Sequence, residues 1–151
     1  MKLLMFLLAS TACVMSLPSR ADDVPPLDGH WHGMLNVKEY SAFFGKSDSI
    51  SIKPYVIYIW NKAIFKESQQ SSSKPYQSEI FKIVFRCKTH DATLLQDIRY
   101  AADGSVVSDD SVADTDAKYF DVNSDSKVDP HQAVVREIAR IDYEITCMKG
   151  D

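Results

Sequence analysis

Apolar and polar positions alternate along most of this chain, which is the pattern of β-strands rather than of helices. The strongest example is Tyr55–Phe65 (YVIYIWNKAIF), in which both alternating sets of positions are apolar. A strand that is apolar on both sides is typical of the centre of a sheet, or of a sheet covered on both faces. A second strand is expected over Tyr76–Cys87, where Phe81, Ile83 and Phe85 share one face.

Shorter alternating segments flank these two strands. Trp31–Phe44 predicts one or two strands with a bulge at Gly33, and Ala92–Ala102 predicts another. Asp103-Gly104 is a hairpin signal that leads into a short strand over Ser105–Val112. The polar run Lys66–Pro75 predicts a flexible connection between strands. These segments together predict an antiparallel meander of about five to six strands.

Near its end the chain changes to helical spacing. Asp129 suits the N-cap of a helix, and Pro130 suits the first helical position. Val134, Ile138, Ile141 and Ile145 then follow the spacing of one helix face. The predicted fold class is therefore α+β, an antiparallel sheet with one C-terminal helix packed on one face.

The first residues have the layout of a secretory signal peptide, with Lys2, an apolar run over residues 3–14 and a small-x-small site at Ser19–Ala21. The run is too short to span a membrane. We therefore expect a signal peptide over 1–21, an extended leader over 22–30 and one domain over 31–151, exported to the periplasm or the outer cell surface.

An alternative start uses Cys13 as a lipid-anchored N-terminus, because a small residue precedes it. The leucine expected three places earlier is replaced by Ser10, which favours cleavage after Ala21.

Under either start, Cys87 and Cys147 are the two cysteines of the folded domain. Two cysteines in an exported chain suggest one disulfide, and the alternative is a pair of buried free thiols. Since Cys87 lies on the apolar face of its strand and Cys147 ends the helix, a bridge would fix the helix end to the core side of the sheet.

The charge balance narrows the choice of partners. Seventeen Lys and Arg against 21 Asp and Glu give a net charge of −4, and loss of Lys2 and Arg20 with the signal peptide makes the mature chain still more acidic. A chain of this kind without a basic run is a poor candidate for binding nucleic acid or anionic lipid.

One loop resembles a calcium site. In Asp121–Gln132 (DVNSDSKVDPHQ), oxygen-bearing side chains occupy positions 1, 3, 5 and 9 of an EF-hand-like loop, namely Asp121, Asn123, Asp125 and Asp129. Ser126 replaces the glycine of the sharp turn, and Gln132 replaces the bidentate glutamate. A weak calcium site and a polar turn that caps the helix both fit these residues, and the turn needs no cofactor.

Other chemistry has little support in the sequence. His30 and His32 would share a strand face and could reach one metal ion, but no third ligand lies near them in sequence. No G-x-S-x-G elbow or phosphate-binding loop occurs. We therefore expect a protein that is not an enzyme.

Several segments resemble the surface-adhesin protein E family of exported Gram-negative proteins, from about Trp31 to Cys147. SDSISIKPYVIYIWNKAIF is similar to the family's early aromatic strand, IVFRC to the strand that ends in its first cysteine, and IRYAADGSVVSDD to the hairpin that follows. DVNSDS stands where the family has a turn before its last helix.

The resemblance implies a small antiparallel sheet packed by a C-terminal helix, with Cys87 bridged to Cys147. It also implies a dimeric adhesin that binds host extracellular-matrix and serum proteins, with no identified ligand-binding residue in this chain. Two alternatives stay open: a periplasmic structural or interaction protein without a host ligand, and a weak calcium-binding module built on Asp121–Asp129.

Overall fold

The computed structural model describes residues 24–45, 50–53, 56–124 and 129–148 as one antiparallel sheet and one long helix. The elements are β1 (Trp31–Asn36), β2 (Tyr40–Gly45), β3 (Ile50–Lys53), β4 (Val56–Gln70), β5 (Pro75–Arg86), β6 (Asp91–Tyr100), β7 (Val106–Ser111), a 3-10 turn (Asp114–Asp116), β8 (Phe120–Asp121) and α1 (Pro130–Thr146). The predicted fold class is confirmed.

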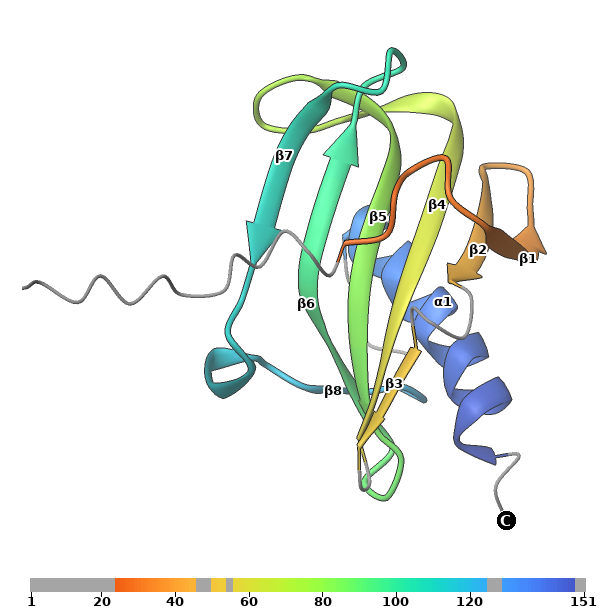
Figure 1. Ribbon diagram of the computed structural model, residues 1–151, viewed down its shortest axis with the longest axis vertical. Coiled ribbons are helices and arrows are strands. Elements are labelled where there is room, and N and C mark those ends of the chain that lie inside the picture. The colour runs from red at the N-terminus through yellow and green to blue at the C-terminus, as the bar shows by residue number, and fades with distance from the viewer. Residues whose placement is uncertain (1–23, 46–49, 54–55, 125–128, 149–151) are drawn as a thin grey trace, which may run out of the picture.

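The strands pair in the order β1-β2-β4-β5-β6-β7, and every pairing is antiparallel (Figure 1). Two short strands lie off this path. β3 pairs with the first part of β4, while β2 pairs with a later part of the same strand, and β8 pairs with the start of β6. The long strand β4 is therefore central, as its apolar character on both sides predicts.

One face of the sheet packs against α1 to form the main core. Phe81, Ile83 and Phe85 of β5 are fully buried there, as their shared face predicts. Ile138 and Ala139 of α1 are also fully buried and belong to the same core cluster. Packing against the sheet, rather than helix propensity alone, supplies most of the stability of such a helix.

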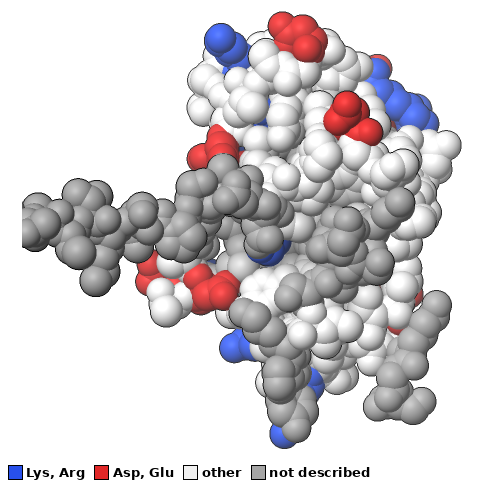
Figure 2. Space-filling view, viewed as in Figure 1, with Lys and Arg blue, Asp and Glu red and all other residues white. Residues whose placement is uncertain are grey.

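The opposite face of the sheet is also covered. Trp60, Ile80 and Val84 point away from α1 and are at most 3% exposed. The leader, residues 24–30, crosses in front of β5 and β4 on this side (Figure 1), and Lys62 donates a hydrogen bond of 2.6 Å to the Leu27 carbonyl. On this face the described Lys and Arg residues are scattered rather than gathered in one patch (Figure 2).

Both ends of α1 are fixed by features that the sequence predicts. At its start the Asp129 carboxylate accepts a hydrogen bond of 3.0 Å from the Gln132 backbone nitrogen, and Pro130 is the first helical residue. At its end Cys147 forms a disulfide with Cys87, and the Tyr143 hydroxyl donates to the Cys87 carbonyl. The predicted disulfide is confirmed, and the alternative prediction of two buried free thiols is wrong.

The face of α1 that packs on the sheet differs from the predicted one. The buried residues are Val135, Ile138, Ala139, Asp142 and Tyr143, whereas Ile145 is 37% exposed. The predicted face is rotated about the helix axis relative to the observed one, because the prediction uses aliphatic residues alone. The structure instead turns a carboxylate and a phenol toward the sheet, where each finds a hydrogen-bond partner.

The structure also tests the predicted connection after β4 and the predicted bulge in β1. The connection predicted over Lys66–Pro75 is shorter, since β4 continues to Gln70 and β5 begins at Pro75. Antiparallel pairing of Gln69 with Tyr76 extends this hairpin beyond the apolar residues. The expected bulge in the first strand is confirmed between Gly33 and Leu35. No helix in the described residues is long and apolar enough to cross a membrane.

A buried charge cluster beside an open pocket as the candidate functional site

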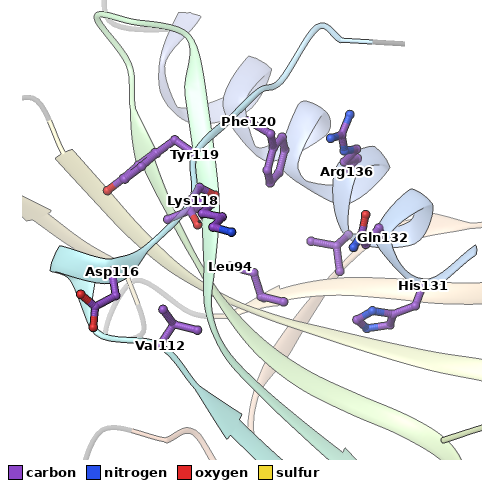
Figure 3. Close-up of a pocket in the computed structure, with 11 residues that line it drawn as sticks. Leu94, Val112, Asp116, Lys118, Tyr119, Phe120, His131, Gln132 and Arg136 are labelled. Atoms are coloured by element: carbon purple, nitrogen blue, oxygen red, sulfur yellow. Dashed lines mark hydrogen bonds between the residues drawn. The ribbon is translucent and has the colours of Figure 1, made fainter. Parts of the chain in front are cut away.

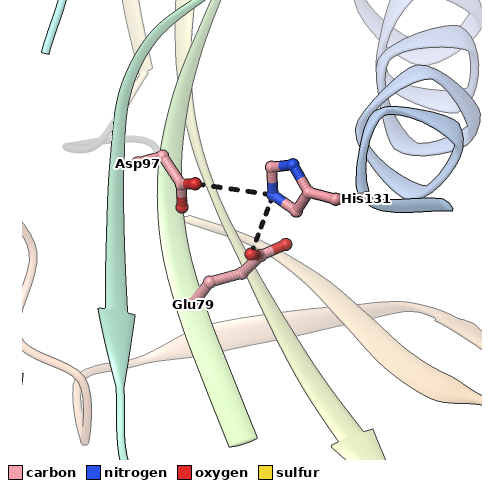
Figure 4. A group of neighbouring side chains, drawn as sticks. All are labelled: Glu79, Asp97 and His131. Atoms are coloured by element: carbon pink, nitrogen blue, oxygen red, sulfur yellow. Dashed lines mark hydrogen bonds and ion pairs between the residues drawn. The ribbon is translucent and has the colours of Figure 1, made fainter. Parts of the chain in front are cut away.

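Three ionisable side chains from three elements meet at the start of α1. Glu79 comes from β5, Asp97 from β6 and His131 from the first turn of α1 (Figure 4). His131 Nε2 lies 3.1 Å from Glu79 Oε2 and 3.4 Å from Asp97 Oδ2. Glu79 is fully buried and Asp97 is 3% exposed, so this is a cluster inside the helix–sheet interface.

Arg99 completes the cluster, which we call the charge cluster: Glu79, Asp97, Arg99 and His131. Arg99 Nη2 lies 2.7 Å from Asp97 Oδ2, and its Nε lies 4.0 Å from Glu79 Oε2. The guanidinium also lies over the Tyr76 ring, 5.1 Å from the ring centroid. One permanent positive charge thus faces two buried carboxylates.

The surroundings alter how these groups bind protons. Burial and the neighbouring charge of Glu79 raise the pKa of Asp97 to about 6, against the opposing effect of Arg99 and His131. Burial disfavours the charged form of His131, but the hydrogen bond and charge of Glu79, with the charge of Asp97, outweigh it and raise its pKa. The carboxylates therefore favour a positive charge on the imidazole.

The charge cluster leaves three buried polar atoms without a hydrogen-bond partner in the described part of the chain, namely Glu79 Oε1, Asp97 Oδ1 and Arg99 Nε. Each such atom costs roughly 1–3 kcal/mol relative to one that is hydrogen-bonded. Three of the five buried side-chain polar atoms without a hydrogen-bond partner in the described residues therefore belong to the charge cluster.

A pocket of about 530 Å³ opens beside His131 (Figure 3). Leu94 of β6, Gln132 and Arg136 of α1, and the segment Lys118–Phe120 line it. The Thr93 hydroxyl donates to the Lys118 carbonyl at 2.9 Å, and the Arg136 guanidinium lies 4.9 Å from the Phe120 ring centroid. The pocket thus combines aromatic, basic and apolar groups with one acidic residue, Asp116.

A second polar pair lies under the C-terminal half of α1. Asn61 Nδ2 of β4 donates a 2.7 Å hydrogen bond to Asp142 Oδ2, and both side chains are almost fully buried. Burial raises the pKa of Asp142 to about 7, against the lowering effect of the bond from Asn61. The Asn61 Oδ1 atom has no partner among the described groups.

The predicted calcium ligands have local roles where the structure describes them. Asp121 Oδ1 accepts from the Asn123 backbone nitrogen at 2.8 Å, and Asp129 caps α1. Asp125 lies outside the described residues. Calcium binding at Asp121, Asn123, Asp125 and Asp129 therefore stays a prediction. A rise in melting temperature with millimolar calcium that Asp121→Ala removes would establish it, and no rise would end it.

In the described part of the chain, no third metal ligand joins the predicted pair His30 and His32. Both His30 and His32 are exposed, and the His32 ring stacks on Phe44 with centroids 5.1 Å apart. Within the described ranges, Glu79, Asp97 and His131 are the one group of three such side chains whose ligand atoms lie within 4.8 Å of one another.

Sequence reasoning missed the charge cluster, although one signal was available. Glu79 has the same strand parity as Phe81, Ile83 and Phe85, so the alternation alone places it on the core face. Asp97 and Arg99 share that face because of a register shift in the β5–β6 pairing between Lys82 and Ile83. The residue types in β6 do not predict that register shift.

Comparison with protein families gives one match. A family model described as "Surface-adhesin protein E" matches residues 31–137, which is more than half of the 151-residue chain. The match covers the whole sheet and the first half of α1, including all four residues of the charge cluster.

Comparison with solved structures finds the Haemophilus influenzae protein E. It is 11% identical to this chain, covers 82% of this chain and 94% of its own, and superposes with a TM-score of 0.39. Because the sequence identity and the TM-score are both low, we conclude nothing about this chain from that structure. A comparison with curated proteins finds no match.

Proposed function

We propose, from the premise that this chain belongs to the surface-adhesin protein E family, that it is an exported, non-enzymatic domain that binds a protein partner. The family match over residues 31–137 is the observation that carries the proposal. We further propose that this partner is a host extracellular-matrix or serum protein, as the resemblance to this family implies.

The pocket beside α1 is the surface that we assign to the partner. Lys118 is exposed at its rim, while Tyr119 and Phe120 are half-buried, so aromatic surface and positive charge lie together. Aromatic residues and arginine are enriched where protein interfaces derive most of their binding energy. In a chain with net charge −4, this site can accept an acidic side chain of a partner.

The walls of this surface are held in place before any partner arrives. The Arg86 guanidinium lies 3.6 Å from the Tyr119 ring centroid and forms an ion pair with Asp91. The Tyr58 hydroxyl donates to Asp114 at 3.1 Å, which ties the preceding turn to β4. A surface fixed in this way loses little conformational entropy on binding.

Solid-phase binding of the purified protein to laminin, vitronectin and plasminogen tests the proposal. We expect saturable binding to at least one of them, weakened several-fold by Lys118→Glu. The matched control is Lys74→Glu, which makes the same charge change in the exposed turn between β4 and β5 and should leave binding unchanged. No binding to any of the three would contradict the host-ligand proposal.

The resemblance also implies a dimer. Light scattering after size exclusion should then give about twice the mass of one chain, and a monomer at micromolar concentration would contradict this part of the proposal alone.

A further inference from the structure

We propose that Glu79, Asp97 and His131 form a site for one divalent transition-metal ion, with zinc as the ion to test, bound in place of the Arg99 guanidinium. Carboxylate oxygens and an imidazole nitrogen are ligands that zinc takes in proteins. The three come from β5, β6 and α1, so a bound ion would join the start of the helix to the middle of the sheet.

The distances between the ligand atoms suit such an ion. Zinc with ligands at about 2.0–2.1 Å in a tetrahedron sets neighbouring ligand atoms about 3.3–3.4 Å apart. The two distances from His131 Nε2 are 3.1 Å to Glu79 Oε2 and 3.4 Å to Asp97 Oδ2. All three ligand atoms lie within 4.8 Å of one another, so a small closure of the two carboxylates would complete three corners.

Unsatisfied atoms point to a ligand independently of these distances. Glu79 and Asp97 are each more than nine-tenths buried, and each carries an oxygen without a hydrogen-bond partner in the described residues. Both carboxylates extend from the sheet toward His131 (Figure 4). A cation held between the two carboxylates and bound through both oxygens of each would give Glu79 Oε1 and Asp97 Oδ1 the partner that they lack.

Charge balance explains how Arg99 and the ion can exchange. With a neutral imidazole, Glu79, Asp97 and Arg99 together carry one net negative charge inside the interface. With Arg99 turned to solvent and the imidazole neutral, a divalent ion balances the two negative charges of Glu79 and Asp97. The Arg99 side chain is 20% exposed, whereas those of Glu79 and Asp97 are 0% and 5% exposed, so Arg99 is the group that can leave.

The neighbouring pocket provides a route for the ion. His131 is 22% exposed at its side chain and lines the pocket, so the imidazole lies between solvent and the buried carboxylates.

Isothermal titration of the EDTA-treated protein with zinc chloride at neutral pH is the test. We expect one ion per chain and a rise in melting temperature on binding. His131→Gln should weaken binding by more than about tenfold, since loss of even an outer partner of a metal ligand costs that much. Arg99→Gln should tighten binding several-fold because it removes the competing cation.

Controls separate this site from other histidines. His32→Gln removes an exposed histidine of β1 and should leave zinc binding unchanged. X-ray absorption should show nitrogen and oxygen neighbours at about 2.0–2.2 Å and no sulfur. Circular dichroism checks that each variant is folded.

Three results would overturn the proposal: no 1:1 binding by the wild-type protein, binding that survives in folded His131→Gln but is lost in His32→Gln, or Arg99→Gln with unchanged affinity. The opposite effect of Arg99→Gln on affinity is the sharpest readout. If these residues formed only a structural ionic network, removing Arg99 would not tighten binding of a metal.

Discussion

Single buried polar residues set how this protein responds to pH. Asp142 lies on the buried face of α1 with Asn61 as its hydrogen-bond partner. Burial raises the pKa of Asp142 to about 7, well above the value near 4 of an aspartate in an unfolded chain. The folded protein therefore binds more protons than the unfolded chain between about pH 4 and 7, and its stability falls as pH rises through that range.

Asp142→Asn should remove this dependence. An asparagine accepts the bond from Asn61 Nδ2 and can donate its own amide to Asn61 Oδ1, which has no partner among the described groups. Between pH 5 and 8 we expect the free energy of unfolding of the wild-type protein to fall by about 2–4 kcal/mol more than that of the variant. Urea unfolding at four pH values measures the difference.

The matched control is Glu144→Gln, a carboxylate-to-amide change at an exposed position of the same helix. It should keep the pH slope of the wild-type protein. An Asp142→Asn variant with that same slope would show that Asp142 is charged in the folded protein across the whole range.

Backbone conformation at single glycines gives a second prediction at this scale. Gly104 has φ +82° in the turn between β6 and β7, and a side chain there would meet nothing within 4 Å. Gly104→Ala should therefore lower the free energy of unfolding by about 1 kcal/mol through backbone strain alone.

Gly33→Ala is the control for that prediction, because a side chain there also meets nothing within 4 Å and the backbone of β1 is not left-handed. The alanine variant should be at least as stable as the wild-type protein. Equal losses from both glycine variants, measured by thermal unfolding, would refute the assignment of the cost to φ.

At this scale the sequence predicts strand faces better than it predicts buried charges. The alternation in Tyr76–Cys87 placed Phe81, Ile83 and Phe85 correctly. Glu79 follows the same alternation, but charged residues are rarely buried without a partner, so the pattern alone does not predict a buried carboxylate there. Its partners come from β6 and α1, and a one-dimensional pattern does not show which distant residues meet.

Among the elements, α1 depends most on features distant in sequence. Its first turn joins the charge cluster, its C-terminal half holds Asp142 against Asn61, and its C-cap Cys147 is bonded to Cys87. The Tyr40 hydroxyl also donates to Glu137 at 2.5 Å. A helix fixed by this many polar contacts packs in one orientation, because a rotation would leave buried groups unpaired.

Removal of the disulfide should destabilise the protein and loosen the end of α1. The bridge joins residues 60 apart, and in the chain-entropy model closing a loop of that length contributes about 4 kcal/mol. We expect Cys87→Ala/Cys147→Ala to lower the free energy of unfolding by about 2–4 kcal/mol. Hydrogen exchange should rise most in the last turn, near Tyr143.

Reduction provides the control for the disulfide prediction. Dithiothreitol should lower the melting temperature of the wild-type protein and leave that of the double variant unchanged. A wild-type protein whose melting temperature does not respond to the reductant would contradict a stabilising role for the bridge.

The order of elements was predictable, but the helix orientation was not. The N-cap at Asp129 and the hairpin at Asp103-Gly104 depend on local chemistry, and the structure confirms both. Which face of α1 meets the sheet depends on Asn61 and on the Cys87 carbonyl, both more than 50 residues away. The aliphatic stripe alone therefore predicted a rotated helix.

At the scale of the whole molecule, coverage of both sheet faces bears on how the protein binds. α1 covers one face and residues 24–30 cross the other, so neither face of the central strands offers a broad apolar surface in the described residues (Figure 1). The pocket between the first half of β6 and the start of α1 stays open although the sheet is covered, and it is the surface that we propose for the partner.

The last prediction concerns where the protein resides. If residues 1–21 are a signal peptide, mass spectrometry of the protein from the cell envelope should give Asp22 as its first residue. A chain that begins at Cys13 and carries added lipid mass would contradict this cleavage and support the anchored alternative.

Exposure at the cell surface is then measured on intact cells. A surface adhesin should be digested by added protease before the outer membrane is opened, whereas a periplasmic protein should be digested only afterwards. The exposed turn between β4 and β5, with the run Ser71–Lys74, gives the protease a first site in the folded domain. Because the paired strands of the described residues resist cleavage, a cut at this turn that leaves those strands intact distinguishes a folded, exposed protein from an unfolded one released by lysis.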